Sequence, residues 1–148
     1  MKASIILLSL LSMSLLSGCQ TISRHPDYVG ADSATLCGRT DPNPFNKNPN
    51  VAIMAVDGVR TPGAKCKTPL ILKPGKHEVR VFVNILSNAT FTVETDLEPN
   101  QKYQIRGRYG STWVGQETYS DEGDKYTVYL LNLDSEEKTP LNKIVPTK

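Results

Sequence analysis

Apolar and polar residues alternate along much of the chain from residue 51 onward, and this alternation limits the possible fold more than any other feature. Successive side chains of a β-strand point to opposite faces, so a period of two places every second residue on one face. The clearest case puts Val79, Val81, Val83 and Ile85 on one face, with Phe82 as an apolar exception on the other. No stretch keeps the period of 3.6 that is typical of an amphipathic helix. The chain is therefore predicted to be all-β.

Turn signals divide the alternating region into short strands. The apolar run 51–56 ends at Asp57-Gly58, a favoured hairpin turn because both residues tolerate a positive φ. Further strands are expected around residues 70–72, 79–85, 91–94, 103–108 and 126–133. Six or seven short strands with frequent turns favour a small antiparallel β-sandwich, and a barrel is the alternative.

The start of the chain has a different pattern. Lys2 precedes an apolar run, 5–16, that is broken only by serines. A bilayer span needs about 20 apolar residues, whereas the apolar core of an export signal needs roughly 7–15. The run ends in Leu16-Ser17-Gly18-Cys19, which resembles the lipobox of bacterial lipoproteins. The resemblance implies that residues 1–18 are a removed signal peptide and that Cys19 is lipidated; an ordinary signal peptide with a chance cysteine is the alternative.

Lipidation of Cys19 would hold the mature chain at a membrane of the bacterial cell envelope. Each buried CH₂ group contributes about 0.8 kcal/mol, and two acyl chains give lasting attachment. Gln20, rather than Asp, follows the cysteine. By resemblance to enterobacterial sorting, this implies the outer membrane, with the protein facing the periplasm.

The segment between the signal peptide and the first alternating run is polar and rich in turn-forming residues. Prolines and asparagines crowd its end, from Asp41 to Asn50, and such sequences do not build long helices. The predicted organisation is a signal peptide (1–18), an irregular lipidated tether (19–50), a β-sandwich domain (51–134) and a polar C-terminal tail (135–148) that is mobile at its end.

Two cysteines remain once Cys19 carries lipid. Export places Cys37 and Cys66 in an oxidising compartment, so a disulfide is predicted. Closing a loop of about 30 residues stabilises a fold by about 3–4 kcal/mol in the chain-entropy model. The alternative, a thiol nucleophile or a metal site, would call for a CxxC pair or nearby histidines, which the sequence lacks.

Three segments are similar to the PEGA-type β-sandwich modules of bacterial surface and periplasmic proteins. They are Val56-Asp57-Gly58, the run 72–81 and the run 97–104. In these modules a V-D-G turn ends one strand, an L-x-P-G-x-H-x-V-x-V corner follows, and a later strand opens with Y-x-[IVL]. The resemblance implies an Ig-like sandwich that serves as an accessory or scaffolding domain without a shared active site.

Few residues suggest catalysis. The two histidines, His25 and His77, belong to no recognisable nucleophile or metal-ligand motif. The acidic residues around Gly123 hint at a cation loop but do not match the calcium-loop pattern. No enzyme activity, cofactor or metal is therefore predicted, although a small envelope hydrolase that uses His77 with a nearby carboxylate stays open as an alternative.

Five residues are candidates for contact with a partner: Arg80, Arg106, Arg108, Trp113 and Tyr119. The arginines project from the solvated faces of strands predicted to be neighbours and could form a patch for anionic lipid or glycan. The alternative is that they pair across strands with residues such as Glu78 and Glu94. Trp113 and Tyr119 lie in the long interruption 110–125, and exposed aromatic residues are enriched where partners bind.

The net charge of +2 gives no basis for binding to nucleic acid. We therefore expect a membrane-anchored, non-enzymatic binding or assembly module of the periplasm. Its partner would be another envelope protein or the cell wall. An accessory lipoprotein of a secretion or surface-fibre machine is a second possibility.

Overall fold

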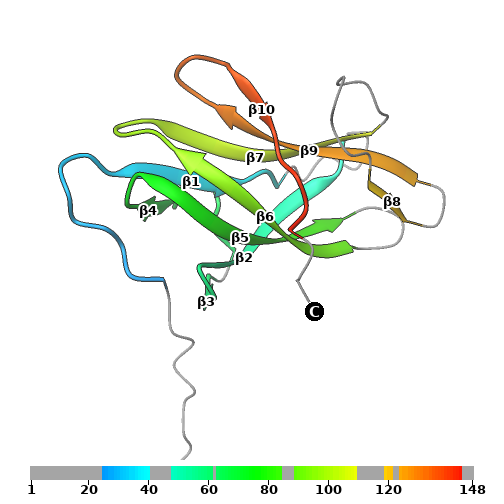
Figure 1. The fold of residues 1–148 in the computed structure, drawn as a ribbon, viewed down its shortest axis with the longest axis horizontal. Coiled ribbons are helices and arrows are strands. Elements are labelled where there is room, and N and C mark those ends of the chain that lie inside the picture. Colours follow the sequence, from blue (N-terminus) through cyan, green and yellow to red (C-terminus); the bar gives the residue numbers. More distant parts are fainter. Residues whose placement is uncertain are drawn as a thin grey trace, which may run out of the picture.

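In the part of the chain that the structure describes, ten strands form two sheets that face each other across one apolar core (Figure 1). The computed structural model describes residues 25–40, 48–61, 63–84, 89–109, 119–121 and 124–144. The strands are β1 (Ala34–Gly38), β2 (Asn50–Val56), β3 (Val59–Arg60), β4 (Leu70–Leu72), β5 (Gly75–Asn84), β6 (Ala89–Leu97), β7 (Lys102–Tyr109), β8 (Tyr119–Asp121), β9 (Asp124–Asn132) and β10 (Lys138–Pro140). The fold is the predicted all-β sandwich, and these residues contain no helix that could cross a membrane.

The first sheet, sheet B, has the order β3-β2-β5-β6. The apolar and polar residues that alternate in the sequence lie on the two faces of this sheet. On β5, for example, Val79, Val81 and Val83 are fully buried against the core. Phe82 points to the other face and is half-buried. Ile85, predicted on the inner face, lies outside the described residues. Burial of one face by alternate apolar residues therefore explains the strands of this sheet.

The second sheet, sheet A, has the order β10-β9-β7-β1-β4, and β8 also pairs with β9. Strand β9 lies between β7 on one side and β8 and β10 on the other. Residues 127–132 are all buried, so both faces of this part of β9 are covered. A polar residue can be buried here only with a partner, and the amide of Asn132 donates to Gln101.

The predicted tether is wrong for residues 34–38, which form a strand inside sheet A. Strand β1 pairs parallel with β7 and antiparallel with β4, so the sandwich is not wholly antiparallel. Ala34 and Leu36 are fully buried in the core. Gly38 passes so close to β2 that an added Cβ would lie 2.3 Å from the Val51 carbonyl oxygen. The domain therefore begins well before residue 51.

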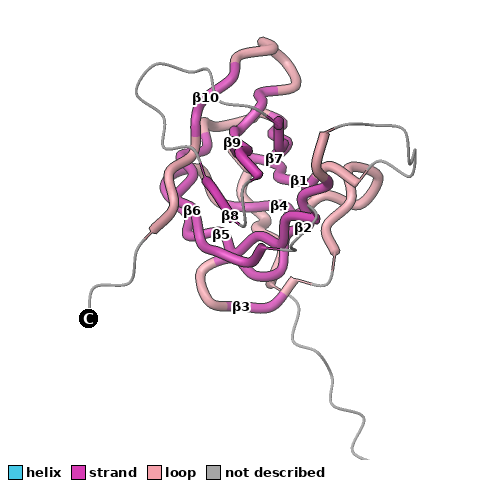
Figure 2. Tube along the Cα trace, turned by 90° about the vertical axis from the view of Figure 1, so that its right-hand side faces the viewer, coloured by secondary structure: helices cyan, strands magenta, loops and turns pink. Residues whose placement is uncertain are grey.

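The predicted polar tail also belongs in part to the sandwich. Strand β10 pairs with β9, and Leu141 is buried in the core. The chain then crosses to the edge of sheet B, where the Ile144 N–H donates to the Thr92 carbonyl oxygen at 2.8 Å. Figure 2 shows this segment running down beside β6. The C-terminal segment thus joins the two sheets along one side, and the boundary predicted at residue 134 is too early.

Two local features agree with the sequence prediction. Asp57 and Gly58 both have positive φ, 48° and 78°, and Val56 pairs with Val59 across them, as expected for a two-residue hairpin. The predicted disulfide joins Cys37 of β1 to Cys66 in the segment before β4. The bond fixes β1 to that segment, which is the attachment expected from the cysteines.

Tyr103, at the start of β7, stabilises the connection from β6. Its hydroxyl oxygen accepts a hydrogen bond from the Glu98 N–H at 3.1 Å. Burial raises the pKa of the Tyr103 hydroxyl, so this group is neutral at ordinary pH. A tyrosine that bonds the backbone a few residues upstream is typical of Greek-key sandwiches.

Candidate functional site

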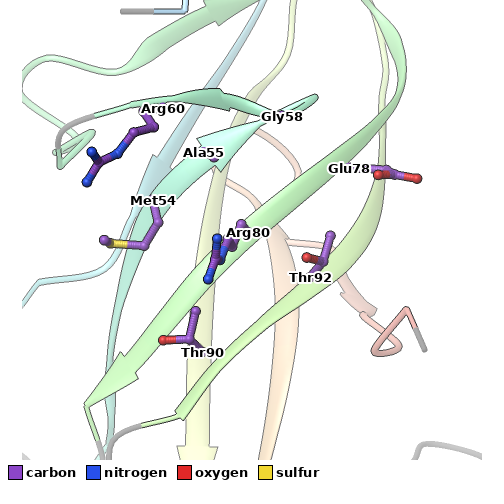
Figure 3. A pocket seen from close by; sticks show the side chains of 8 residues that line it. All are labelled: Met54, Ala55, Gly58, Arg60, Glu78, Arg80, Thr90 and Thr92. Atoms are coloured by element: carbon purple, nitrogen blue, oxygen red, sulfur yellow. The ribbon is translucent and has the colours of Figure 1, made fainter. Parts of the chain in front are cut away.

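The outer face of sheet B carries an open hollow of about 400 Å³. Strands β2, β5 and β6 and the β2–β3 hairpin supply its walls (Figure 3). The hollow is lined by Met54, Ala55, Gly58, Arg60, Glu78, Arg80, Thr90 and Thr92. Among the five residues predicted to contact a partner, Arg80 is the one that this site contains.

A bulge in β2 shapes the hollow. Ile53 pairs with Val81 and Ala55 pairs with Arg80, so Met54 is an extra residue between two consecutive pairs. Its side chain is 40% exposed although it lies in an apolar run. The Met54 carbonyl oxygen accepts a hydrogen bond from Thr61 beyond β3. Bulges redirect side chains and are common beside functional sites, and here the bulge leaves a thioether at the surface.

Arg60 and Arg80 give the hollow its positive charge. Figure 3 shows their side chains on the same side as Met54, whereas Glu78 points the opposite way. Within the described part of the chain, neither guanidinium group has an ion-pair partner. Arginine binds carboxylate and phosphate groups through two parallel hydrogen bonds. The site can therefore accept an anionic group.

In the described chain, neither carboxylate predicted to pair with the arginines does so, and Glu78 lines the hollow but points away from them (Figure 3). Glu94, predicted as a partner of the arginines, instead accepts a hydrogen bond from the Lys76 ammonium at 3.0 Å. The hydrogen bond to Glu94, helped by the charge of that carboxylate, raises the pKa of Lys76. Glu94 is thus neutralised by Lys76, and Arg80 remains available.

The predicted patch of three arginines does not form. Arg80 lies on β5 of sheet B, whereas Arg106 and Arg108 lie on β7 of sheet A. The Arg106 Nε donates to the side-chain oxygen of Gln104 on the same strand. Arg108 is exposed on sheet A. The prediction of one patch is wrong because alternation assigns a residue to a face but not to a sheet.

His77 and Asp57 form a close pair at the end of sheet B. His77 Nδ1 lies 2.7 Å from Asp57 Oδ2, and His77 Nε2 lies 2.6 Å from the Lys73 carbonyl oxygen. A carboxylate and a carbonyl oxygen are both hydrogen-bond acceptors, so each ring nitrogen of His77 faces an acceptor at hydrogen-bond distance. The His77 side chain is 10% exposed, and both of its ring nitrogens are engaged within the protein, so neither is open to a substrate.

The Asp57 carboxylate also stabilises the hairpin. Its Oδ1 accepts a hydrogen bond from the Glu78 N–H at 3.0 Å, and His25 Nε2 lies 4.0 Å from Oδ2. Burial acts to raise the pKa of Asp57, but the hydrogen bonds from His77 and Glu78 and the nearby histidine charges outweigh it, so the pKa is lowered. Asp57 is therefore ionised and holds three parts of the chain together.

A second hollow, of about 450 Å³, lies where the described chain begins. It is lined by residues 25–27, Thr61, Gly63, Ala64 and residues 68–70. The Tyr28 N–H donates to the Ile71 carbonyl oxygen at 2.9 Å, which fixes the entering segment beside β4. The segment 25–28 is thus attached to the end of the domain that carries the β2–β3 hairpin.

The remaining predicted site residues are not brought together. Cys19 and Trp113 lie outside the described residues, and for Tyr119 the structure describes the backbone in β8 but not the side chain. No group of three His, Cys, Asp or Glu side chains that could hold a metal ion occurs among the described residues. Of the cation loop suggested around Gly123, the backbone of Asp121 and Asp124 is described in β8 and β9, whereas Glu122 and Gly123 lie outside the described residues.

Arg80 is the only lining residue of the hollow that was predicted as a contact residue, and the two most important residues that were missed are Arg60 and Met54. Arg60 could have been found, because the Asp57-Gly58 turn places Val59 and Arg60 opposite the end of β2. Met54 could not, since a bulge leaves no mark in an unbroken apolar run. Comparison of the chain with family models, with curated proteins and with solved structures gives no match.

Proposed function

We propose that this chain is a lipid-anchored, non-enzymatic binding or assembly module of the bacterial cell envelope, and that it docks through the outer face of sheet B. Cys19 would carry the acyl chains, and the sandwich that begins near residue 25 would be the working domain. The proposal places the protein at the outer membrane, facing the periplasm. It needs no cofactor or metal.

One observation carries the proposal: the hollow on sheet B presents Arg60 and Arg80 without a carboxylate partner in the described chain. The hollow opens on a sheet face, its hydroxyl groups are those of Thr90 and Thr92, and its one carboxylate, Glu78, points away from the arginines (Figure 3). Sites of catalysis need a nucleophile or a general base within reach of the substrate. Charged side chains on an open face are better suited to binding a partner than to catalysis.

The geometry of His77 argues against the hydrolase alternative. Both ring nitrogens are engaged, one with Asp57 and one with the Lys73 carbonyl. We expect His77→Ala to lower the melting temperature because the ring connects the hairpin to the corner before β5. Loss of biological function with an unchanged melting temperature would instead support the hydrolase.

Fractionation of cells that express Cys19→Ser tests the anchor. The unaltered protein should appear in the membrane fraction, with a mature mass that includes acyl chains on Cys19. The Cys19→Ser protein should keep its fold and lose that mass and that location. Identical location and mass for the two proteins would overturn the proposal.

A further inference from the structure

The hollow on sheet B lies beside the point where the described chain begins. His25 Nε2 is 4.0 Å from Asp57 Oδ2, and Gly58, which follows Asp57 in the chain, lines the hollow. Figure 1 shows the start of the described chain and β3 at the same lower side of the molecule. The hydrogen bond from Tyr28 to Ile71 holds the entering segment at this position.

The distance from this point to Cys19 is limited by the length of the chain. His25 is six residues after Cys19. An extended chain covers at most about 3.6 Å per residue, so His25 stays within about 22 Å of an acylated Cys19. A folded domain that is held so close to a membrane must turn one of its surfaces toward it. Two surfaces adjoin the attachment point: the second hollow, which His25 itself lines, and the outer face of sheet B, which begins at Gly58 and carries Arg60 and Arg80.

The charge of the outer face of sheet B suits an anionic membrane. Arg60 and Arg80 have no ion-pair partner in the described part of the chain, whereas Glu94 is paired with Lys76 and Asp57 with His77. Glu78 is the one acidic residue that lines the hollow, and it points away from the two arginines (Figure 3). The side of the hollow that holds the guanidinium groups is therefore cationic.

We propose that Arg60 and Arg80 bind the phosphate groups of anionic lipids in the membrane that anchors the chain. This inference rests on the proposed lipidation of Cys19. Guanidinium groups bind phosphate through paired hydrogen bonds, the hydroxyls of Thr90 and Thr92 add donors, and the exposed Met54 supplies an apolar contact for the glycerol region. Docking would orient the sandwich, so that sheet A faces away from the membrane toward other partners.

Photo-crosslinking to lipid tests this contact. The mature lipidated protein, with a benzophenone amino acid in place of Met54, is reconstituted in vesicles of phosphatidylcholine alone or mixed with phosphatidylglycerol. Lipid adducts are measured by mass spectrometry. Leu133 is a matched control position because it is as exposed as Met54, 41% against 40%, and follows β9 of sheet A. We expect adducts at position 54 in the anionic vesicles and few at position 133.

Substitution of the arginines then tests the charge. A basic residue near an anionic surface contributes about 1 kcal/mol, which corresponds to about a fivefold change in the ratio of docked to undocked protein. Arg60→Gln and Arg80→Gln should each lower the adduct yield at position 54 by about that factor. Arg108→Gln, an exposed arginine on sheet A, should leave it unchanged.

Failure of this inference can be distinguished from failure of the proposed function. Flotation of the protein with neutral phosphatidylcholine vesicles reports the acyl anchor alone, because that surface offers no net charge. A protein that does not float has no anchor, and both proposals fail. A protein that floats, yet gives equal adduct yields at position 54 in neutral and anionic vesicles, overturns the lipid contact only. In isolated envelopes, crosslinking of position 54 to a protein instead of to lipid would also overturn the lipid contact.

Discussion

His77 Nδ1 lies 2.7 Å from Asp57 Oδ2, so the corner that opens β5 is bonded directly to the hairpin turn between β2 and β3. The same ring donates to the Lys73 carbonyl, and the same carboxylate accepts from the Glu78 N–H. These bonds connect the turn that carries Gly58 to the strand that carries Arg80. The shape of the hollow therefore depends on this pair.

Asp57 should make stability depend on pH in acid. Its pKa is lowered in the folded protein, so the unfolded chain binds more protons at acidic pH and stability rises with pH in that range. The contribution of the carboxylate is complete above its unfolded pKa, about 3.9, and is lost as the pH falls through the lower folded value. Urea unfolding of the protein at a series of acidic pH values measures this loss.

Asp57→Asn is the control for that experiment, because Asn also tolerates the positive φ of this position. The variant should be less stable than the unaltered protein near neutral pH, and the difference should shrink as the pH falls. If the two proteins lose stability in parallel down to the lowest pH, Asp57 does not contribute as described.

Leu36→Ala tests whether β1 is part of the core. Leu36 is fully buried between the sheets, and removal of such a side chain costs about 2–5 kcal/mol. Leu133→Ala removes the same atoms from a side chain that is 41% exposed and should change stability by about 0.5 kcal/mol or less. Chemical denaturation of both variants gives the comparison. Equal, small effects would mean that residues 34–38 are a tether after all.

The disulfide should stabilise the domain through the loop that it closes. Cys37 and Cys66 are 29 residues apart, which corresponds to about 3–4 kcal/mol in the chain-entropy model. Cys37→Ala with Cys66→Ala should lower the free energy of unfolding by about that amount. A reducing agent should destabilise the unaltered protein to a similar degree and leave the double variant unchanged. Sensitivity of the double variant to the reducing agent would point to another cause.

Leu141→Ala tests the C-terminal boundary of the domain. Leu141 is 3% exposed, its N–H donates to the Val128 carbonyl oxygen, and it leads to the segment that reaches Thr92 of β6. We expect a loss of about 2–5 kcal/mol and faster exchange of the Ile144 amide hydrogen, measured by NMR. A variant with unchanged stability and exchange would show that the sandwich ends before residue 141.

The sequence alone determined the local features of this protein. Alternation identified the faces of β5, β6 and β7, because side-chain direction in a strand depends only on the neighbouring residues. The Asp57-Gly58 hairpin followed from the φ values that these two residues tolerate. The Cys37–Cys66 bond followed from the number of cysteines and from the expected compartment.

The tertiary structure decided which strands are neighbours. The parallel pairing of β1 with β7 joins segments more than 60 residues apart, and nothing in the polar segment before residue 51 predicts it. Strand pairing also places Arg80 on one sheet and both Arg106 and Arg108 on the other. On its own sheet, Arg80 instead lies beside Arg60 and Met54. A period of two tells which residues are buried together on one strand. Which distant strand completes the sheet depends on packing of the whole core, so the hollow becomes visible only in the folded molecule.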